Sequence, residues 1–470
     1  MKKRPLWLLL AAFAPAACSE TPMPALQPGD VPAQFEQKAP STAPLWPAAD
    51  WWNGFGDGQL SQLILTARRN NLDIAQAVAR LYQADARARQ AGATLLPSIG
   101  FNSNINSLNG QSDRGSLRET DWGAGIGAAY ELDFWGRNRN TARSAEALRS
   151  ASFADRASVA LTVTTAVADS YFQLLSLRER ITVAKSNLKS AEDILGIVQR
   201  RVTAGYAASA DLIKQRASLA AERAVLPPLE QQEVETRNAL AILLGMPPEG
   251  FTISDISLAN IGQPQATPGL PAEILTRRPD IAAAEANLVS AHADLQVARA
   301  AFLPSINLSA SGGFAYPALS GAINSLQGGG LATAAGATLA QVIFDGGAIK
   351  AKSDEAKARE NELLAAYRAS IIAALSDVEI AMARLDHIRA QEEAIRSQTA
   401  EAEKVLNAAK RKYTAGYADF LVVTDAQRSL YAARDQSTDL RRANLSATVA
   451  LFKALGGGWS AGSSKPGNAQ

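Results

Sequence analysis

The sequence has one cysteine, two histidines and almost no net charge, and each of these shortages excludes a class of protein. A single Cys among 470 residues rules out disulfide frameworks and Cys-based zinc or iron–sulfur sites. His292 and His387 lie far apart, and no phosphate-binding loop motif occurs. Lys and Arg number 47 against 45 Asp and Glu, which argues against a nucleic-acid-binding surface. We therefore expect no enzyme, no cofactor, no metal site and no nucleic acid.

Long apolar runs are also scarce, except for a short one at the N-terminus. The basic stretch Lys2–Arg4 precedes the apolar run Leu6–Ala14, which is too short to span a bilayer, so residues 1–17 read as a signal peptide. Cys18 follows two alanines as in a bacterial lipobox, although Pro15 stands where that motif has Leu. We expect Cys18 to be lipidated; the alternative is an ordinary export signal with an incidental Cys. No later stretch predicts a transmembrane helix.

The rest of the chain consists mainly of two copies of an internal sequence repeat. Short motifs return 207 residues later in the first part of each half and 211 residues later in the second part. The pairs are Leu96–Ile99 with Leu303–Ile306, Thr203–Tyr206 with Thr414–Tyr417, and Leu244–Gly245 with Leu455–Gly456. We predict a tether over 18–58, repeats over 59–245 and 270–456, a linker over 246–269 and a tail over 457–470.

The two repeats show the same order of hydrophobic patterns, first helical, then alternating and then helical again. A helical pattern over 59–95 ends before Pro97, and strict alternation over 99–106 and 121–134 predicts two strands around a polar loop over 107–119. The stretch 138–203 lacks proline and carries apolar residues at heptad spacing, which predicts one helix about 100 Å long. A return helix over 208–244 follows. The second repeat predicts strands over 305–314 and 331–344 and helices over 348–414 and 419–455.

Four strands are too few to close a membrane barrel. An open sheet edge in lipid leaves backbone groups unpaired, so several chains must contribute strands to one barrel. A dimer would give eight strands with a filled lumen, and a trimer would give twelve with room for a pore. The alternative is a soluble β-hairpin domain with helices attached. Long helices that share heptad seams must pack laterally, which predicts a tube with the Thr-Ala-Gly-Tyr turns at its tip.

Four segments carry a resemblance to a known family. Leu275–Glu285, Tyr413–Gly416, Asp425–Arg428 and Leu451–Trp459 are similar to signatures of the TolC/OprM outer-membrane factors, and the resemblance runs from about residue 50 to 459. The chain looks closest to the lipoprotein branch of tripartite RND-type efflux systems. The resemblance implies a mixed α/β trimer with a twelve-stranded barrel, a periplasmic helical tunnel and an equatorial belt.

The same resemblance implies a periplasmic gate at the tip of the tunnel. Asp211, Tyr413, Leu421 and Asp425 match or neighbour gate positions, whereas Ala418 stands where the family has a basic partner. A Tyr–Asp hydrogen bond between helices would latch the gate, and a threefold ring of Asp425 would favour cations. The alternative is that Asp211 and Asp425 are solvated residues near helix starts.

The tip turns are also the expected docking surface for a partner. Gly205 and Gly416 follow long helices, where Gly is the usual left-handed cap. In the family, a periplasmic adaptor (membrane fusion) protein docks at this place, and the implied surface comprises Arg201, Gly205, Tyr206, Lys412, Gly416 and Tyr417.

The leading functional prediction is a passive outer-membrane exit duct for small molecules. Its expected partners are two further copies of the chain, the adaptor, an inner-membrane RND pump and outer-membrane lipid. The expected location is the outer membrane, with a lipid anchor and a periplasmic extension. Two alternatives are a duct for type I protein secretion and a periplasmic coiled-coil scaffold without a channel.

Overall fold

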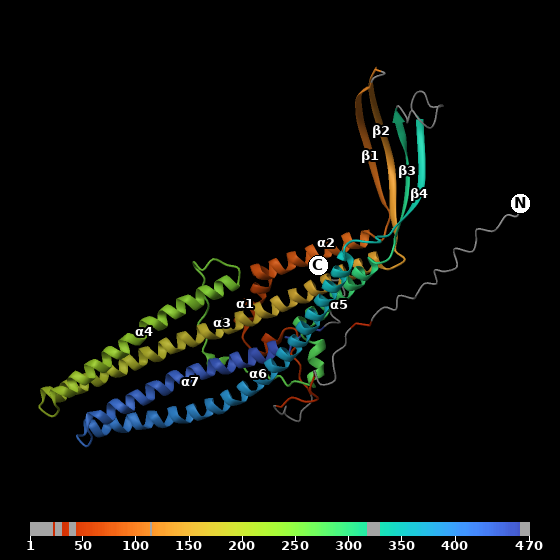
Figure 1. Cartoon of the computed structure of the whole chain (residues 1–470). Coiled ribbons are helices and arrows are strands. Elements are labelled where there is room, and N and C mark those ends of the chain that lie inside the picture. Colours follow the sequence, from red (N-terminus) through yellow and green to blue (C-terminus); the bar gives the residue numbers. More distant parts are fainter. Residues whose placement is uncertain (1–21, 24–30, 37–43, 113–114, 317–329, 461–470) are drawn as a thin grey trace. The chain divides into compact units, whose positions relative to one another are not determined.

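The computed structural model describes residues 22–23, 31–36, 44–112, 115–316 and 330–460 (Figure 1). The predicted signal peptide and Cys18 lie outside the described residues. The chain divides into two compact units. The sheet unit contains Leu81–Ala151 and Ala284–Tyr367, and the helical unit contains Pro28–Arg80, Ser152–Ala283 and Arg368–Gln470. In the described part of the chain, no helix is apolar over a sufficient length to cross a membrane.

The sheet unit holds four antiparallel strands in the order β1-β2-β3-β4. They are β1 (Ser98–Ser112), β2 (Gly115–Leu132), β3 (Ser305–Tyr316) and β4 (Gly330–Ala340). Each repeat supplies one hairpin, and the two hairpins join through β2 and β3. The polar loop predicted over 107–119 was wrong, because the β1–β2 ladder continues through Ser107↔Thr120 to Ser112↔Gly115. Backbone pairing there overrides the polar sequence.

The last strand is shorter than predicted, and a turn with two left-handed glycines separates it from the next helix, which begins at Ala348. β4 ends at Ala340 rather than at Phe344. Gly346 and Gly347 have φ of 66° and 93°, and the Asp345 carboxylate accepts hydrogen bonds from the backbone N–H groups of Gly347 and Ile349. Positive φ and an N-terminal cap are incompatible with a continuing strand.

The strand register gathers apolar side chains on one face of the sheet. Pairs such as Phe101↔Ile126 and Phe314↔Leu331 stand side by side, and paired residues of antiparallel strands share a face. That face carries Ile99, Phe101, Ile105, Trp122, Ile126, Tyr130, Leu308, Phe314, Leu331 and Leu339. The opposite face carries mainly Asn, Gly and Ser, as in Asn102, Asn104, Gly125, Ser309 and Ser311. In the single chain, the apolar face is open to solvent, and Ile105 is 78% exposed.

Two pairs of long helices follow the hairpins. α3 (Arg137–Thr203) and α6 (Ala348–Thr414) have 67 residues each, and their return helices α4 (Ser209–Leu243) and α7 (Phe420–Ala454) have 35 each (Figure 1). The predicted heptad seam of α3 is buried or half-buried from Val163 to Val202. The shorter elements are α1 (Gly58–Asn70), α2 (Leu72–Ala93), α5 (Pro279–Ala300), and the 3₁₀ helices η1 (Trp51–Phe55), η2 (Leu258–Asn260) and η3 (Pro271–Thr276).

The helix predicted over 59–95 is divided at Asn71. The Asn71 side chain accepts hydrogen bonds from the backbone N–H groups of Asp73 and Ile74 and donates one to the Leu243 carbonyl oxygen. Because Asn71 has an extended conformation, α1 ends and α2 begins there. An Asn side chain that satisfies a new helix start competes with the helical conformation of its own backbone.

The segment predicted as a tether over 18–58 ends in an ordered, buried turn. Trp51, Trp52 and Phe55 of η1 belong to the main core of the helical unit, and Phe55 is completely buried. Phe172 of α3 and Phe452 of α7 complete the aromatic cluster, with ring centroids 5.2 Å from Phe55 and Trp51, respectively. Aromatic side chains of this size fix a segment that composition alone marks as extended.

The repeated Leu-Gly motifs mark two equivalent close approaches of the backbone. Gly245, after α4, and Gly456, after α7, have φ of 68° and 85°. A Cβ at Gly245 would overlap the Asn70 carbonyl oxygen, and one at Gly456 would overlap the Arg277 carbonyl oxygen. Only glycine satisfies both the positive φ and the contact.

Candidate functional site

The candidate site lies at the tips of the two helical hairpins of the helical unit. The first hairpin is α3–α4 with the turn 204–208, and the second is α6–α7 with the turn 415–419. Gly205 and Gly416 both have left-handed backbone conformations, with φ of 73° and 83°. In each turn, three N–H groups bond back to the last helical carbonyls, such as Tyr206 N to Arg201 O at 2.8 Å and Tyr417 N to Lys412 O at 2.9 Å.

The two tip tyrosines project from these turns. Tyr206 is 77% exposed and Tyr417 is 85% exposed, and Lys412 is exposed as well. Large exposed aromatics beside sharp turns form a surface that a protein partner can cover.

The start of α7 carries two of the residues that matter for the gate hypothesis on one helical face. Leu421 and Asp425 are one turn apart and both exposed, while Val423 and Ala426 on the opposite face are buried in the core. Asp425 pairs with Arg428 at 3.2 Å, a partner that our sequence reasoning missed although i, i+3 spacing indicates it. Asp211, in the first turn of α4, is partly exposed.

Tyr413 differs from the expectation because its hydroxyl makes no hydrogen bond to Asp211 within this chain. Its side chain is only 4% exposed and packs against Phe420 with ring centroids 5.4 Å apart. Among the described residues, the Tyr413 hydroxyl has no hydrogen-bond partner. Burial raises the pKa of Tyr413, and the negative charge of Asp211 raises it further.

Arg201 differs from the prediction of an exposed docking residue, because its guanidinium is directed into the tip. Nη1 donates to the carbonyl oxygens of Tyr413 at 2.7 Å and Thr414 at 2.9 Å, and Nη2 donates to the Tyr206 carbonyl oxygen at 3.3 Å. Cζ lies 4.7 Å from the centre of the Tyr413 ring. The last carbonyls of α6 carry the negative end of the helix dipole, so they attract a cation even where a turn N–H also donates, as Gly416 N does to Tyr413 O at 3.0 Å.

A second buried arginine, which the sequence reasoning quoted only as part of a motif, lies at the other end of α7. Arg278 Nε and Nη2 pair with Asp280 at 3.1 and 2.6 Å, and Nη2 also reaches Asp377 of α6 at 3.0 Å. Nη1 donates to the Ala454 carbonyl oxygen at the end of α7 at 3.2 Å. One side chain therefore connects the start of α5 to α6 and α7. The Arg-Pro-Asp order before a helix is the sequence signal that could have indicated this network.

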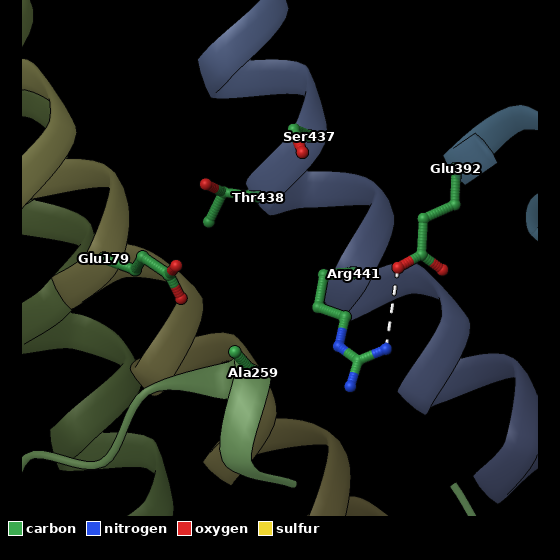
Figure 2. Close-up of a pocket in the computed structure, with 6 residues that line it drawn as sticks. All are labelled: Glu179, Ala259, Glu392, Ser437, Thr438 and Arg441. Carbon is green, nitrogen blue, oxygen red and sulfur yellow. Dashed lines mark ion pairs between the residues drawn. The ribbon is translucent and has the colours of Figure 1, made fainter. Parts of the chain in front are cut away.

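A polar hollow of about 280 Å³ opens between α3, α6, α7 and η2 (Figure 2). Arg441 pairs with Glu392 across its mouth at 3.5 Å and donates to the Ile261 carbonyl oxygen at 3.1 Å. Glu179 reaches it from α3, and Ala259, Ser437 and Thr438 complete the lining. In the part of the chain that the structure describes, no group of His, Cys, Asp and Glu is placed to hold a metal ion. The hollow offers ion pairing and hydrogen bonding without a nucleophile–base arrangement.

Comparison with known proteins gives one consistent result. The family model described as "Outer membrane efflux protein" matches residues 63–246 and 270–457. The chain is 39% identical to the pyoverdine export outer membrane protein OpmQ of Pseudomonas putida, over 98% of both chains. It is 30% identical to the probable outer membrane lipoprotein SilC of Salmonella typhimurium, over 98% of this chain and 100% of that one.

The solved structures agree with the sequence comparison. The outer-membrane channel OprN superposes with a TM-score of 0.82 at 28% identity, covering 91% of this chain and 99% of that one. The mostly helical chain with a four-stranded sheet is therefore the architecture of an outer-membrane channel protein. These relatives are export or channel proteins rather than enzymes, as the sequence predicts for this chain.

Proposed function

We propose that this chain, which belongs to the outer membrane efflux protein family, forms a trimeric exit duct of a tripartite efflux pump. The observation that carries the proposal is the sheet. It has a continuous apolar face, a polar face of Asn, Gly and Ser, and two edges formed by β1 and β4. In lipid, such a sheet must close with other copies, and three chains give twelve strands around a wet pore.

Exposed apolar residues on the helices support lateral packing between copies. Ile372 and Ile380 of α6 are 61% and 62% exposed, and they recur at i, i+8, which places them on one stripe of the helix. Ile213 and Ile242 of α4 are also exposed. Neighbouring chains that cover these stripes would build a helical tube, and the linker 246–269 with the ordered end of the tether would form its equatorial belt.

The tip would then serve as both gate and docking surface. Leu421 and Asp425 share an exposed face at the start of α7, so three copies would form an apolar ring and a carboxylate ring around the axis. The Tyr413 hydroxyl is buried within the chain and has no hydrogen-bond partner among the described residues, so it would reach Asp211 only if the tip rearranged. The exposed Tyr206, Lys412 and Tyr417, with the glycine turns, would receive a periplasmic adaptor, which connects the duct to an inner-membrane RND pump.

The cargo is a small molecule, and the named relatives favour a secreted siderophore of the pyoverdine type. The relative at 39% identity is named for pyoverdine export. The relative named SilC is described as a probable lipoprotein, which supports lipidation of Cys18 and anchoring of the tether in the outer membrane.

The test is made on the purified, detergent-solubilised full chain. Cross-linking should give a trimer, planar bilayers should show discrete channels, and intact mass should show a diacylglycerol on Cys18. Deletion of the gene should reduce siderophore export, and the wild-type gene should restore it. A monodisperse, folded monomer without detergent would contradict the duct, whereas a channel-forming trimer that leaves siderophore export unchanged would contradict only the cargo.

A further inference from the structure

We propose that His292 and Glu360 form a pH-sensitive brace between α5 and α6, which tightens as the pH falls. The inference goes beyond the proposed duct and does not depend on it. Both residues belong to the sheet unit, in which α5 leads into β3 and α6 follows β4. His292 Nδ1 lies 2.7 Å from Glu360 Oε1, and both side chains are buried. The brace therefore joins the two helices that flank the second β-hairpin.

The carboxylate of the brace has a second partner on its own helix. Lys357 Nζ donates a hydrogen bond to Glu360 Oε2 at 2.6 Å. Burial alone would raise the pKa of Glu360, but hydrogen bonds and positive charge from Lys357 and His292 lower it. Glu360 is therefore ionised at neutral pH. Because an ionised carboxylate only accepts hydrogen bonds, His292 Nδ1 carries the hydrogen of this contact, and a further proton binds at Nε2.

Protonation of the imidazole changes the kind of bond that joins the helices. Histidine is the only side-chain type that ordinarily changes its charge between pH 5 and 8. A neutral imidazole donates an ordinary hydrogen bond to Glu360, whereas an imidazolium forms a stronger, charge-assisted one. Lys357 opposes the second positive charge, but its side chain is half-exposed, so solvent screens the repulsion. The contact should therefore be tighter at pH 5.5 than at pH 7.5.

The other groups that face the brace do not titrate in this range. Beside it, α3 meets α5 through a neutral hydroxyl pair, Ser144 and Ser290, at 2.9 Å. Two turns further along both helices, burial raises the pKa of Tyr367 of α6, and the negative charge of Glu285 of α5 raises it further. Carboxyl and phenol groups ordinarily titrate outside pH 5 to 8. The titration that we assign to the brace therefore belongs to His292.

The first repeat contains the equivalent brace with acidic and basic residues exchanged. Its members Asp85, Glu146 and Arg149 lie 207 or 211 residues before those of the second brace. Arg149 Nε of α3 pairs with Asp85 of α2 at 3.0 Å, and Arg149 Nη1 pairs with Glu146 of its own helix at 2.6 Å. None of these three is a histidine, so this brace keeps its charges between pH 5 and 8. Acidification should therefore act on the second repeat only.

The experiment follows backbone hydrogen exchange of the purified full-length protein in detergent at pH 5.5 and 7.5. Each rate is corrected for the intrinsic pH dependence of exchange. In the wild type, peptides within 284–300 and 352–366 should be protected about threefold more strongly at pH 5.5, because charge-assisted hydrogen bonds are about twice as strong as neutral ones. Peptides within 81–93 and 141–155 of the first repeat should show equal protection at both pH values.

Three variants assign the effect to the brace. His292→Gln keeps an N–H donor for Glu360 but cannot titrate, so the pH difference should disappear. His387→Gln removes the other histidine, which is exposed on α6, and should keep the full difference. Asp85→Asn breaks the ion pair with Arg149 and should weaken protection of the first repeat equally at both pH values.

Equal protection of the second repeat at both pH values in the wild type would overturn the proposal. A pH difference that survives in His292→Gln, or one of the same size in the first repeat, would overturn it as well. If His292→Gln does not fold, Glu360→Gln decides by the same measurement. It keeps an acceptor without the charge, so the difference should vanish or reverse, and a retained difference would contradict the brace. Because no channel measurement enters, the result is independent of the proposed duct.

Discussion

Replacing Arg278 by methionine should destabilise the helical unit by about 3 kcal/mol. The arginine side chain is 10% exposed, whereas those of Asp280 and Asp377 are 45% and 54% exposed, so solvent screens both ion pairs. Two screened pairs contribute about 1 kcal/mol together. The Ala454 carbonyl oxygen at the end of α7 would also lose its charged donor, which costs about 2 kcal/mol.

The expected loss is measurable as a shift in thermal unfolding. At about 2.1 cal/mol/K per residue, unfolding of the 470-residue chain has an entropy of about 1 kcal/mol/K. A loss of about 3 kcal/mol should therefore lower Tm by about 3 °C, which circular dichroism of the detergent-solubilised protein can follow. Arg278→Lys should recover part of the loss, because it keeps a charge near Asp280 while losing the fork.

The effect should also depend on pH with a defined sign. Burial alone would raise the pKa of Asp280, but hydrogen bonds and charge from Arg278 and the Ile281 N–H group lower it below its ordinary value near 3.8. A carboxylate with a lowered folded pKa contributes stability above its unfolded pKa and loses that contribution as pH falls through the folded pKa. The difference between wild type and Arg278→Met should therefore shrink below about pH 4. A difference that is absent at pH 7, or constant down to pH 3, would refute the reasoning.

Two further predictions follow from the fold and the gate. Gly456→Ala should lower Tm by several degrees, because the new Cβ would overlap the Arg277 carbonyl oxygen at a φ of 85°. The control Gly92→Ala in α2 places its Cβ in open space, so it should leave Tm unchanged or raise it. Equal changes in Tm for the two variants would contradict the close approach at Gly456. Asp425→Asn should reduce cation preference in bilayers, because the proposed trimer would lose three carboxylates near its axis. Unchanged reversal potentials in a salt gradient would mean that Asp425 only forms a solvated ion pair with Arg428.

Much of the architecture could be predicted from local pattern alone. The alternation of β2, the heptad seam of α3 and the two Thr-Ala-Gly-Tyr turns are each determined by neighbours in sequence, and the structure contains all three. The errors have a common cause in contacts that are distant in sequence. Asn71 divides a helical pattern because it bonds to Leu243, and η1 is ordered because its aromatics meet Phe172 and Phe452.

The candidate site shows the same limit more sharply. Glycine turns and an exposed carboxylate at α7 follow from residue type and spacing, and the structure contains both. The direction of the Arg201 side chain does not follow from them, because a basic residue near a helix end usually serves its own helix or solvent. Its acceptors lie 212 and 213 residues away, at a distance that no local pattern encodes.

Arg201 and Arg278 together show how a duplicated chain becomes asymmetric. Each arginine donates to the end of a helix in the second repeat, Arg201 to the last carbonyls of α6 and Arg278 to the last carbonyl of α7. Their counterparts use other chemistry: Lys412 faces solvent, and Asn71 reaches the equivalent end of α4 with a short neutral amide. The second hairpin therefore receives a charged donor at both ends, whereas the first receives one at its tip, from Arg201 to the Tyr206 carbonyl oxygen, and a neutral amide at its other end. A hairpin tied at both ends by charge can be released at one end while the other holds, which is what the proposed gate at the tip would require.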